Sequence, residues 1–361
     1  MNKKLGFGLM RLPLTDPNNN GSIDIELLKK MVDAYLQRGF TYFDTAWMYC
    51  DGKSECAVKE VLTQRYPRDA YTVTSKLPNG PLNCLEDRDK VFYEQLRKTG
   101  LEYFDYYLLH AIGTQNIDRF LQYDCFNWLM EKKAQGLAKK IGFSFHGTPE
   151  LLEDLLSKYP QLDVVQLQIN YLDWENEKVC SRKCHEIAVR HGKQIIIMEP
   201  VRGGALADVP EKVKMMFKNA DSHLSVASWA IRFAASLENV MMVLSGMSNL
   251  EQVLDNTDYM LEFKPLTKSE MDMALFAGQI ISGQAKIACT GCAYCIERCP
   301  KNIAIPQYFA AFNKDDQAQY EELTKVFGKA SDCISCGQCE RACPQLLSIR
   351  KYLKNVAEKF E

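Results

Sequence analysis

Short apolar runs rich in Val, Ile, Phe and Tyr alternate along the chain with longer stretches of helical period. The runs recur at intervals of about thirty residues, as strands do when each is followed by a helix. Eight runs are present: Leu5–Leu9, Thr41–Thr45, Tyr71–Lys76, Phe104–Leu109, Lys140–Ser144, Val164–Gln168, Ile195–Met198 and Val240–Leu244. They predict an α/β fold, a (β/α)8 or TIM barrel. A doubly wound sheet is the alternative, but it needs an early G-x-G-x-x-G turn, which the sequence lacks.

The stretches between these runs predict the barrel helices. Amphipathic segments cover Ile23–Gln37, Arg88–Lys98, Ile117–Lys133, Glu177–His191 and Leu224–Phe233, and glycines follow the first four of them as C-terminal stops: Gly39, Gly100, Gly136 and Gly192. Pro265 then interrupts the pattern, so we expect the barrel to occupy residues 1–264 and a second domain residues 265–361. Thr267 is placed to cap a helix over Lys268–Ser282, and the later segments Ile305–Phe312, Gln317–Phe327 and Ser348–Phe360 also have helical period. The second domain is therefore predicted to be small and mostly α-helical.

This second domain contains two copies of one cysteine motif, C-x2-C-x2-C-x3-C-P. That run holds [4Fe–4S] clusters, and in two-cluster ferredoxins the fourth cysteine of each run ligates the other cluster. Structural zinc instead favours well-separated C-x2-C pairs. The sequence therefore predicts two [4Fe–4S] clusters in a dicluster ferredoxin-like domain. The ligands of cluster 1 are Cys289, Cys292, Cys295 and Cys343, and those of cluster 2 are Cys333, Cys336, Cys339 and Cys299.

Composition narrows the class of partner. The net charge is −2, so no basic field indicates nucleic acid or an anionic membrane surface. No segment approaches the roughly 20 apolar residues of a membrane span, and the start of the chain has no apolar signal core. The six cysteines outside the two motifs show no disulfide framework. We expect a soluble cytoplasmic protein whose partner is a small molecule.

Four ionisable residues fall at consecutive strand ends, where such barrels carry their chemistry. Asp44 ends the second predicted strand with Tyr49 five residues later, Lys76 ends the third, and His110 ends the fourth. Each alone is explained by capping, snorkelling or packing, but together they suit general acid–base chemistry on a carbonyl or an alcohol. Lys76 is expected to stabilise the tyrosinate form of Tyr49, Asp44 to hold Lys76 charged, and His110 to orient a substrate oxygen.

The sequence Phe43-Asp44-Thr45-Ala46 with Tyr49, then Thr74-Ser75-Lys76 and Leu108-Leu109-His110, resembles the catalytic tetrad of the aldo-keto reductases. With the cysteine motifs, the chain resembles the iron–sulfur branch of that family. The resemblance implies a nicotinamide cofactor, with Ser144, Gln168 and Asn170 near the nicotinamide. It implies a pyrophosphate loop at Arg202, Gly203 and Gly204, and an adenosine end at Ser245, Gly246, Gln252 and Asn256.

The identity of the cofactor stays open at this point. Where many family members place Lys and Arg against the 2′-phosphate of NADP(H), this chain has Gly246 and Gln252, with Asp255 close by. NAD(H) is therefore an alternative to NADP(H). A second alternative is FMN, its phosphate on Arg202, Gly203 and Gly204, because a flavin converts a hydride into the single electrons that clusters accept.

Three functions follow from these alternatives. In the first, the enzyme is an aldo-keto reductase that reduces a carbonyl or oxidises an alcohol with a nicotinamide. In the second, a flavin enzyme relays single electrons through the clusters to an external electron carrier. In the third, the chain is an electron-transfer or docking protein with an inactive barrel. We also expect part of the second domain to border the active site, with Tyr49, Trp47 and Trp174 as apolar walls.

Overall fold

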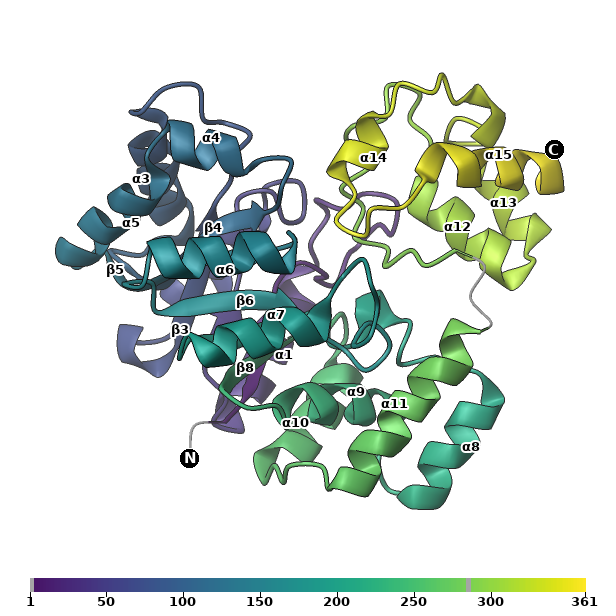
Figure 1. The fold of residues 1–361 in the computed structure, drawn as a ribbon, viewed down its shortest axis with the longest axis horizontal. Coiled ribbons are helices and arrows are strands. Elements are labelled where there is room, and N and C mark those ends of the chain that lie inside the picture. The colour runs from purple at the N-terminus through teal and green to yellow at the C-terminus, as the bar shows by residue number, and fades with distance from the viewer. Residues whose placement is uncertain (1–2, 284–286) are drawn as a thin grey trace.

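Eight parallel strands close into a barrel in chain order, which confirms the predicted (β/α)8 fold (Figure 1). The computed structural model describes residues 3–283 and 287–361. The strands are β1 (Leu5–Gly8), β2 (Tyr42–Asp44), β3 (Thr72–Leu77), β4 (Phe104–Ile112), β5 (Ala138–Phe145), β6 (Val164–Gln168), β7 (Gln194–Met198) and β8 (Val240–Gly246). Pairing of Leu5 with Val243 closes the barrel between β1 and β8.

Helices cover the barrel on its outside. They are α1 (Ile25–Gln37), α2 (Ser54–Val58), α3 (Asp87–Thr99), α4 (Ile117–Gln122), α5 (Cys125–Ala134), α6 (Pro149–Lys158), α7 (Ser181–Arg190), α8 (Glu211–Ala220), α9 (Val226–Ala235) and α10 (Leu250–Leu261). The single helix predicted over residues 117–133 is two helices, because Asp124 adopts a left-handed φ of 46° that stops helical hydrogen bonding. Gly100 ends α3 as predicted, with φ at 68° and its N–H bonded to the carbonyl of Leu96.

The helix α11 (Lys268–Ser282) begins at Thr267, whose side chain and that of Glu270 form a capping box. Its buried residues Ala274 and Ala277 belong to the barrel core. Gly278 lies so close to the barrel that a Cβ would be 2.7 Å from the carbonyl oxygen of Tyr171. The predicted domain boundary at residues 264 and 265 precedes this helix. We propose that the barrel part extends through Ser282.

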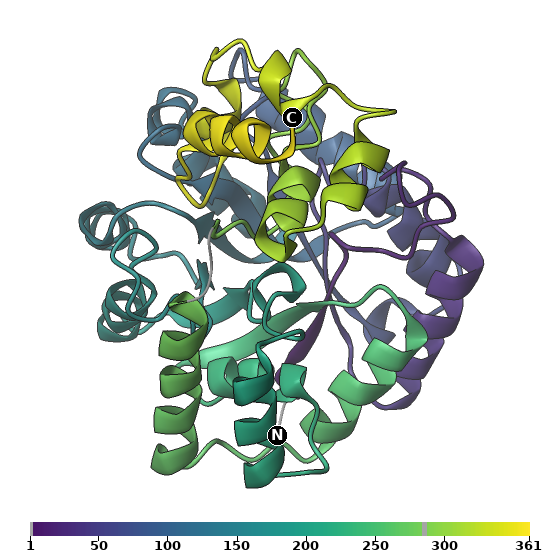
Figure 2. The ribbon, with the colours of Figure 1, turned by 90° about the vertical axis from the view of Figure 1, so that its right-hand side faces the viewer.

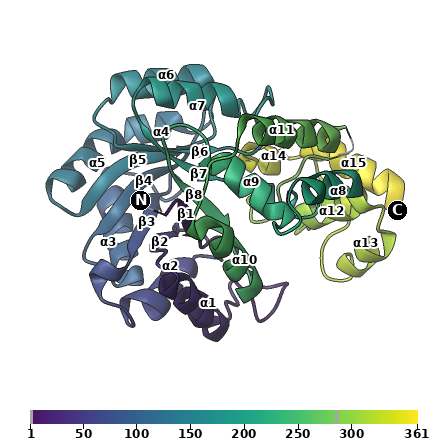
Figure 3. The same ribbon diagram turned by 90° about the horizontal axis from the view of Figure 1, so that it is seen from below.

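The rest of the chain forms a smaller helical unit, here called the cluster module (residues 287–361). Its helices are α12 (Ile305–Lys314), α13 (Gln317–Leu323), α14 (Gln338–Ala342) and α15 (Ile349–Phe360). Residues such as Ile305, Tyr308, Phe309 and Leu353 give it a hydrophobic core of its own. The module lies at one end of the molecule, beside the barrel (Figures 2 and 3). Among the described residues, no helix has both the length and the apolarity to span a bilayer.

Candidate active site and cysteine cavities

The four predicted catalytic residues meet at the C-terminal ends of β2, β3 and β4. Asp44 is the last residue of β2, Lys76 lies one residue before the end of β3, and His110 lies near the end of β4. Tyr49 follows β2 in a turn. Only 2% of Asp44, 0% of Lys76 and 6% of His110 is exposed, so these polar groups act on one another rather than on water.

The Lys76 ammonium is the centre of this cluster. Its Nζ lies 2.5 Å from Oδ1 of Asp44, 2.8 Å from the carbonyl oxygen of Thr45 and 3.4 Å from the hydroxyl oxygen of Tyr49. Gln166 donates to the other oxygen of Asp44 at 3.3 Å. Burial raises the pKa of Asp44 and lowers the pKa of Lys76, and their mutual attraction opposes both shifts. Removing one partner of such a buried pair costs about 3 to 5 kcal/mol of stability.

The acidity of Tyr49 differs from the expectation. Burial, together with the carboxylates of Asp44 and Glu199, raises the pKa of the Tyr49 hydroxyl well above its ordinary value. Its hydrogen bond with Tyr294 and the charge of Arg11 act in the opposite direction. The Lys76 charge is already paired with Asp44, so it does not make Tyr49 an easily ionised phenol. At neutral pH Tyr49 is a protonated donor.

His110 is a neutral imidazole beside this donor. The rings of Tyr49 and His110 are 5.8 Å apart and meet edge to face. Burial, followed by the positive charge of Lys76, lowers the pKa of His110 well below its ordinary value. A neutral imidazole has one N–H, which suits it to donate a hydrogen bond to a substrate oxygen.

A groove of about 270 Å³ leads away from Asp44 and Tyr49 across the ends of β7, β8 and β1. Six of the predicted cofactor residues line it: Gly203, Gly204, Ser245, Gly246, Gln252 and Asn256. Arg11, Glu199 and Asp255 line it as well. Arg11 is the one basic residue among the described residues of this lining, and its guanidinium is 3.4 Å from the carboxylate of Glu199. Arg11 and Glu199 were not predicted, because nothing in the local sequence marks them.

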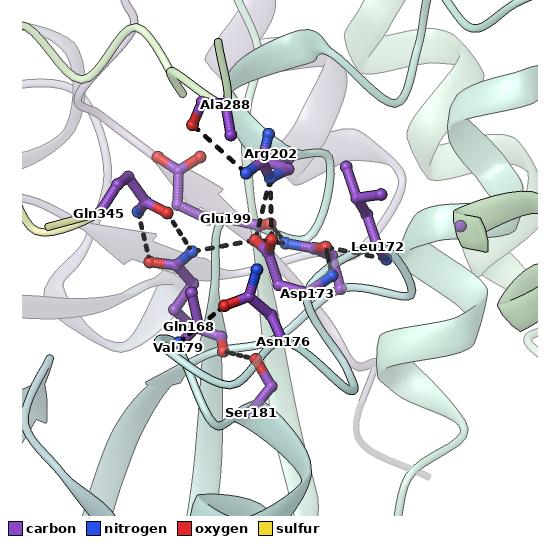
Figure 4. A network of polar contacts seen from close by, with 12 residues as sticks. Gln168, Leu172, Asp173, Asn176, Val179, Ser181, Glu199, Arg202, Ala288 and Gln345 are labelled. Carbon is purple, nitrogen blue, oxygen red and sulfur yellow. Dashed lines mark hydrogen bonds and ion pairs between the residues drawn. The ribbon is translucent and has the colours of Figure 1, made fainter. Parts of the chain in front are cut away.

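The other four predicted cofactor residues lie outside that lining and are bonded within the protein. Oγ of Ser144 accepts the N–H of Ala111 at 2.7 Å. Asn170 and Gln168 donate to the carboxylate of Asp173, and Arg202 forms a buried ion pair with it at 3.0 Å (Figure 4). Gln168 also exchanges two amide hydrogen bonds with Gln345 of the cluster module, at 2.8 and 3.1 Å. These side chains form a network that joins the barrel to the module.

Further contacts bring the first cysteine loop onto the mouth of the barrel. Tyr294, between Cys292 and Cys295, hydrogen-bonds to Tyr49. The carbonyl of Thr290 accepts from Arg11 at 3.1 Å, and it packs so closely on Gly203 that a Cβ there would lie 1.8 Å from its oxygen. This agrees with the expectation that the second domain borders the active site.

The two tryptophans proposed as apolar walls lie elsewhere. Trp174 packs edge-on against Phe233 with ring centres 5.7 Å apart, and Trp47 lies under the ammonium of Lys98. Both pack against the barrel core, and neither lines the groove. Aromatic residues in loops are drawn to any apolar surface, so their sequence position alone did not distinguish these two environments.

The eight motif cysteines line two separate cavities. One is lined by Cys289, Cys292, Cys295 and Cys343, with Ile305 and Phe309 among its apolar neighbours. The other is lined by Cys333, Cys336, Cys339 and Cys299. Each cavity therefore combines three cysteines of one motif with the fourth of the other motif. Four thiols around one largely apolar cavity are a donor set that fits a [4Fe–4S] cluster.

The chain belongs to the aldo/keto reductase family, whose family model matches residues 4–274. A 4Fe-4S dicluster domain model matches residues 288–347. The chain is 26% identical over 253 residues to an aldo-keto reductase of Mycolicibacterium smegmatis, an alignment that covers 70% of this chain and 82% of the relative. The sequence-based recognition of an aldo-keto reductase with a C-terminal iron–sulfur domain is thereby confirmed.

Solved structures share the barrel fold. The holo form of the aldo-keto reductase AKR11C1 from Bacillus halodurans superposes with a TM-score of 0.62 at 22% identity, covering 76% of this chain and 91% of that one. An aldo-keto reductase of Klebsiella pneumoniae in complex with NADPH gives 0.58 at 18% identity, covering 77% and 90%.

Proposed function

We propose that this protein reduces a carbonyl group, or oxidises the corresponding alcohol, with a nicotinamide cofactor, and that Asp44, Tyr49, Lys76 and His110 carry the reaction. The observation that supports this most strongly is the distance of 3.4 Å between the ammonium of Lys76 and the hydroxyl of Tyr49, with His110 beside them. General acid–base reduction needs a proton donor, a polarising donor and a charge that holds them in place.

In the proposed reaction, the substrate oxygen accepts hydrogen bonds from Tyr49 and from neutral His110. A bound nicotinamide would supply the hydride that the carbonyl carbon accepts. Tyr49 donates its proton to the oxygen as negative charge develops there, and it becomes a phenolate beside Lys76. The high pKa of Tyr49 is compatible with this step, because an alkoxide is a stronger base than a phenolate. Alcohol oxidation is the reverse and requires Tyr49 to be deprotonated.

The groove supports NAD(H) over NADP(H) as the preferred cofactor. Gly203 and Gly204 offer backbone to a pyrophosphate near the guanidinium of Arg11. At the other end, Asp255 lines the groove with its carboxylate bonded to Ser225 at 2.7 Å. A carboxylate there repels a 2′-phosphate and suits a ribose hydroxyl.

Ser144, Gln168 and Asn170 are proposed to face the nicotinamide once their internal bonds rearrange. The Klebsiella pneumoniae aldo-keto reductase of the same fold was solved in complex with NADPH, which supports a nicotinamide as the cofactor.

We further propose that the two cysteine cavities hold two [4Fe–4S] clusters with the ligand sets predicted from the motifs. Without a converter between hydride and single electrons, these clusters stay outside the carbonyl reaction.

The test uses protein purified without oxygen and assayed with NADH or NADPH and a panel of aldehydes. We expect oxidation of the cofactor that depends on aldehyde and is faster with NADH. Tyr49→Phe should lower kcat by about 10²- to 10⁴-fold, the usual contribution of a general acid. Tyr93→Phe, on the exposed side of α3, is the control and should leave kcat unchanged. If Tyr49→Ala leaves every oxidoreductase assay unchanged, the barrel is inactive and the docking function stands instead.

The second candidate is a flavin-dependent enzyme that passes single electrons through the clusters to an external carrier. The hydrogen bond between Tyr294 and Tyr49 favours it, because it joins the first cysteine loop to the active site. FMN would place its phosphate at Gly203 and Gly204, although Arg202 is already paired with Asp173. Reconstitution with FMN distinguishes the two: only the flavin enzyme should retain FMN through gel filtration and then reduce its clusters with NADH.

A further inference from the structure

A second and larger cavity lies between the barrel and the cluster module. It measures about 450 Å³, within the usual range for small-molecule sites. Its barrel wall comes from the end of β4, with His110, and from the loops after β2 to β6, with His146 in the loop after β5. Its other wall comes from the module and includes Tyr294, Arg298 and Arg341. Neither part of the protein would form this cavity alone.

The charges around this cavity are unequal. Three basic residues line it, Lys178, Arg298 and Arg341, against one acidic residue, Glu297. None of the three basic side chains forms an ion pair with any residue in the described part of the chain. Burial lowers the pKa of His146 to about 4 and also lowers that of His110, so both imidazoles are neutral at pH 7. The lining therefore carries a net positive charge.

The cavity also reaches the reacting groups. His110 faces it, and Tyr294, which lines it, is bonded to the hydroxyl of Tyr49. Tyr49 itself lines the groove and its bonded neighbour Tyr294 lines the larger cavity, so this pair of tyrosines connects the two. A substrate in the second cavity would present its carbonyl oxygen to His110 and Tyr49, while the remainder of the molecule extends toward the module.

We propose that this cavity is the substrate pocket and that Arg298 and Arg341 recognise an anionic group, a carboxylate or a phosphate monoester, on the carbonyl substrate. The inference rests on the proposed function and adds the substrate class to it. A planar guanidinium offers paired N–H donors that match either oxyanion. The module thus contributes substrate specificity to a reaction whose catalytic residues lie in the barrel.

The test compares three aldehydes of matched shape: benzaldehyde, 4-carboxybenzaldehyde and 4-formylphenyl phosphate. With the cluster-loaded protein and NADH, kcat/KM for at least one anionic aldehyde should exceed that for benzaldehyde by 10-fold or more. For each anionic aldehyde, the ratio of its kcat/KM to that of benzaldehyde is taken. The aldehyde with the larger ratio shows whether the cavity prefers a carboxylate or a phosphate. The double variant Arg298→Gln, Arg341→Gln should bring the ratios close to one and leave kcat/KM for benzaldehyde unchanged. Lys351→Gln, an exposed cation on α15 outside this lining, is the control.

A binding measurement separates this inference from the proposed function. Calorimetry with benzoate and phenyl phosphate should show binding that the double variant weakens about 10-fold and that Lys351→Gln does not change. If no aldehyde is reduced but this binding pattern holds, the proposed function fails and the anion site stands. If anionic and neutral aldehydes are reduced equally well, the inference is overturned. It is also overturned if the double variant impairs only electron exchange with an acidic carrier protein, because the arginines would then form a docking surface.

Discussion

The two cysteine loops share one sequence motif but lie in different surroundings. In the first loop, Thr290 contacts Arg11 and Gly203, and Tyr294 hydrogen-bonds to Tyr49. In the second loop, Cys336 is exposed and 58% of Ile334 faces solvent. The motif predicts the same set of iron ligands in both. The residues between these cysteines differ. Thr290 and Tyr294 place the first loop against Arg11 and Tyr49, whereas the second loop is more exposed and reaches the larger cavity through Gln338 and Arg341.

The largest difference should appear when one ligand of each loop is removed. Cys292→Ala removes a proposed cluster ligand from the loop that places Tyr294 and Thr290 on the barrel. Misplacement of such contacts by about 1 Å costs roughly 100-fold in rate. We expect this loss in kcat/KM, with weaker NADH binding measured by fluorescence. With a neutral aldehyde, which has no anionic group for Arg341 to bind, Cys336→Ala should change both quantities less than about threefold. The iron content of each variant shows whether its other cluster is retained. If both variants retain it and lose kcat/KM equally, the distinction between the loops is contradicted.

Adjacent glycines test the contact of the first loop with the barrel. Gly203 and Gly204 both have positive φ, 66° and 97°, so alanine strains the backbone at either position. Only at Gly203 would the new Cβ also collide with the carbonyl of Thr290, and nothing lies within 4 Å of the corresponding atom at Gly204. Gly203→Ala should therefore lower the free energy of unfolding by about 1 to 3 kcal/mol more than Gly204→Ala. Thermal denaturation of the two variants measures this, and equal melting temperatures would argue against the packing.

Corresponding positions in the two motifs test the hydrogen bond to Tyr49. Tyr294 precedes the third cysteine of the first motif, and Gln338 holds that position in the second. The bond from Tyr294 lowers the pKa of Tyr49, so Tyr294→Phe should raise that pKa further. Alcohol oxidation needs deprotonated Tyr49, so its pH profile should move to higher pH with kcat about 2- to 10-fold lower at pH 8. Gln338 lines the proposed substrate pocket, so Gln338→Leu can change KM, but it should leave the pH profile in place. A shift to lower pH in Tyr294→Phe would contradict the assignment.

The smallest effect is expected at the residue after each motif proline. Gln345 pairs with Gln168, whereas Lys301 holds the same position after the first motif. Gln345→Ala removes this partner and leaves the side-chain amide of Gln168 free. A bound nicotinamide could then form hydrogen bonds with Gln168 in its place. The dissociation constant for NADH should fall by about 2- to 10-fold, the value of one hydrogen bond. Lys301→Ala should not change it. Weaker binding in Gln345→Ala would show that Gln345 supports the cofactor site.

The barrel, and the placement of four ionisable residues at its mouth, could be predicted because both depend on local rules; the catalytic role of the four stays a prediction. All eight strands were located from apolar periodicity, and Asp44, Lys76 and His110 were recognised from their places at strand ends. The break at Asp124 was missed because nothing in the helical period over residues 117–133 indicates a left-handed residue.

Contacts between distant segments were beyond the reach of these rules. Gln168 and Gln345 are 177 positions apart, and no periodicity relates them. The direction of the pKa shift at Tyr49 was also missed, because it depends on burial and on Glu199, which only the folded chain brings close. Arg298 and Arg341 belong to no motif that the sequence marks, and only the fold places them in one cavity with His110.

The most direct test of the central claim, that the barrel carries the reaction and the clusters stay outside it, is rapid mixing of the anaerobic protein with NADH. Without aldehyde, the cluster absorbance at about 400 nm should not change. With aldehyde, NADH should be consumed one-to-one with alcohol formed, and Tyr49→Phe should abolish this consumption. Bleaching of the cluster band by NADH alone would contradict the account, because electrons would then leave the barrel through the cluster module.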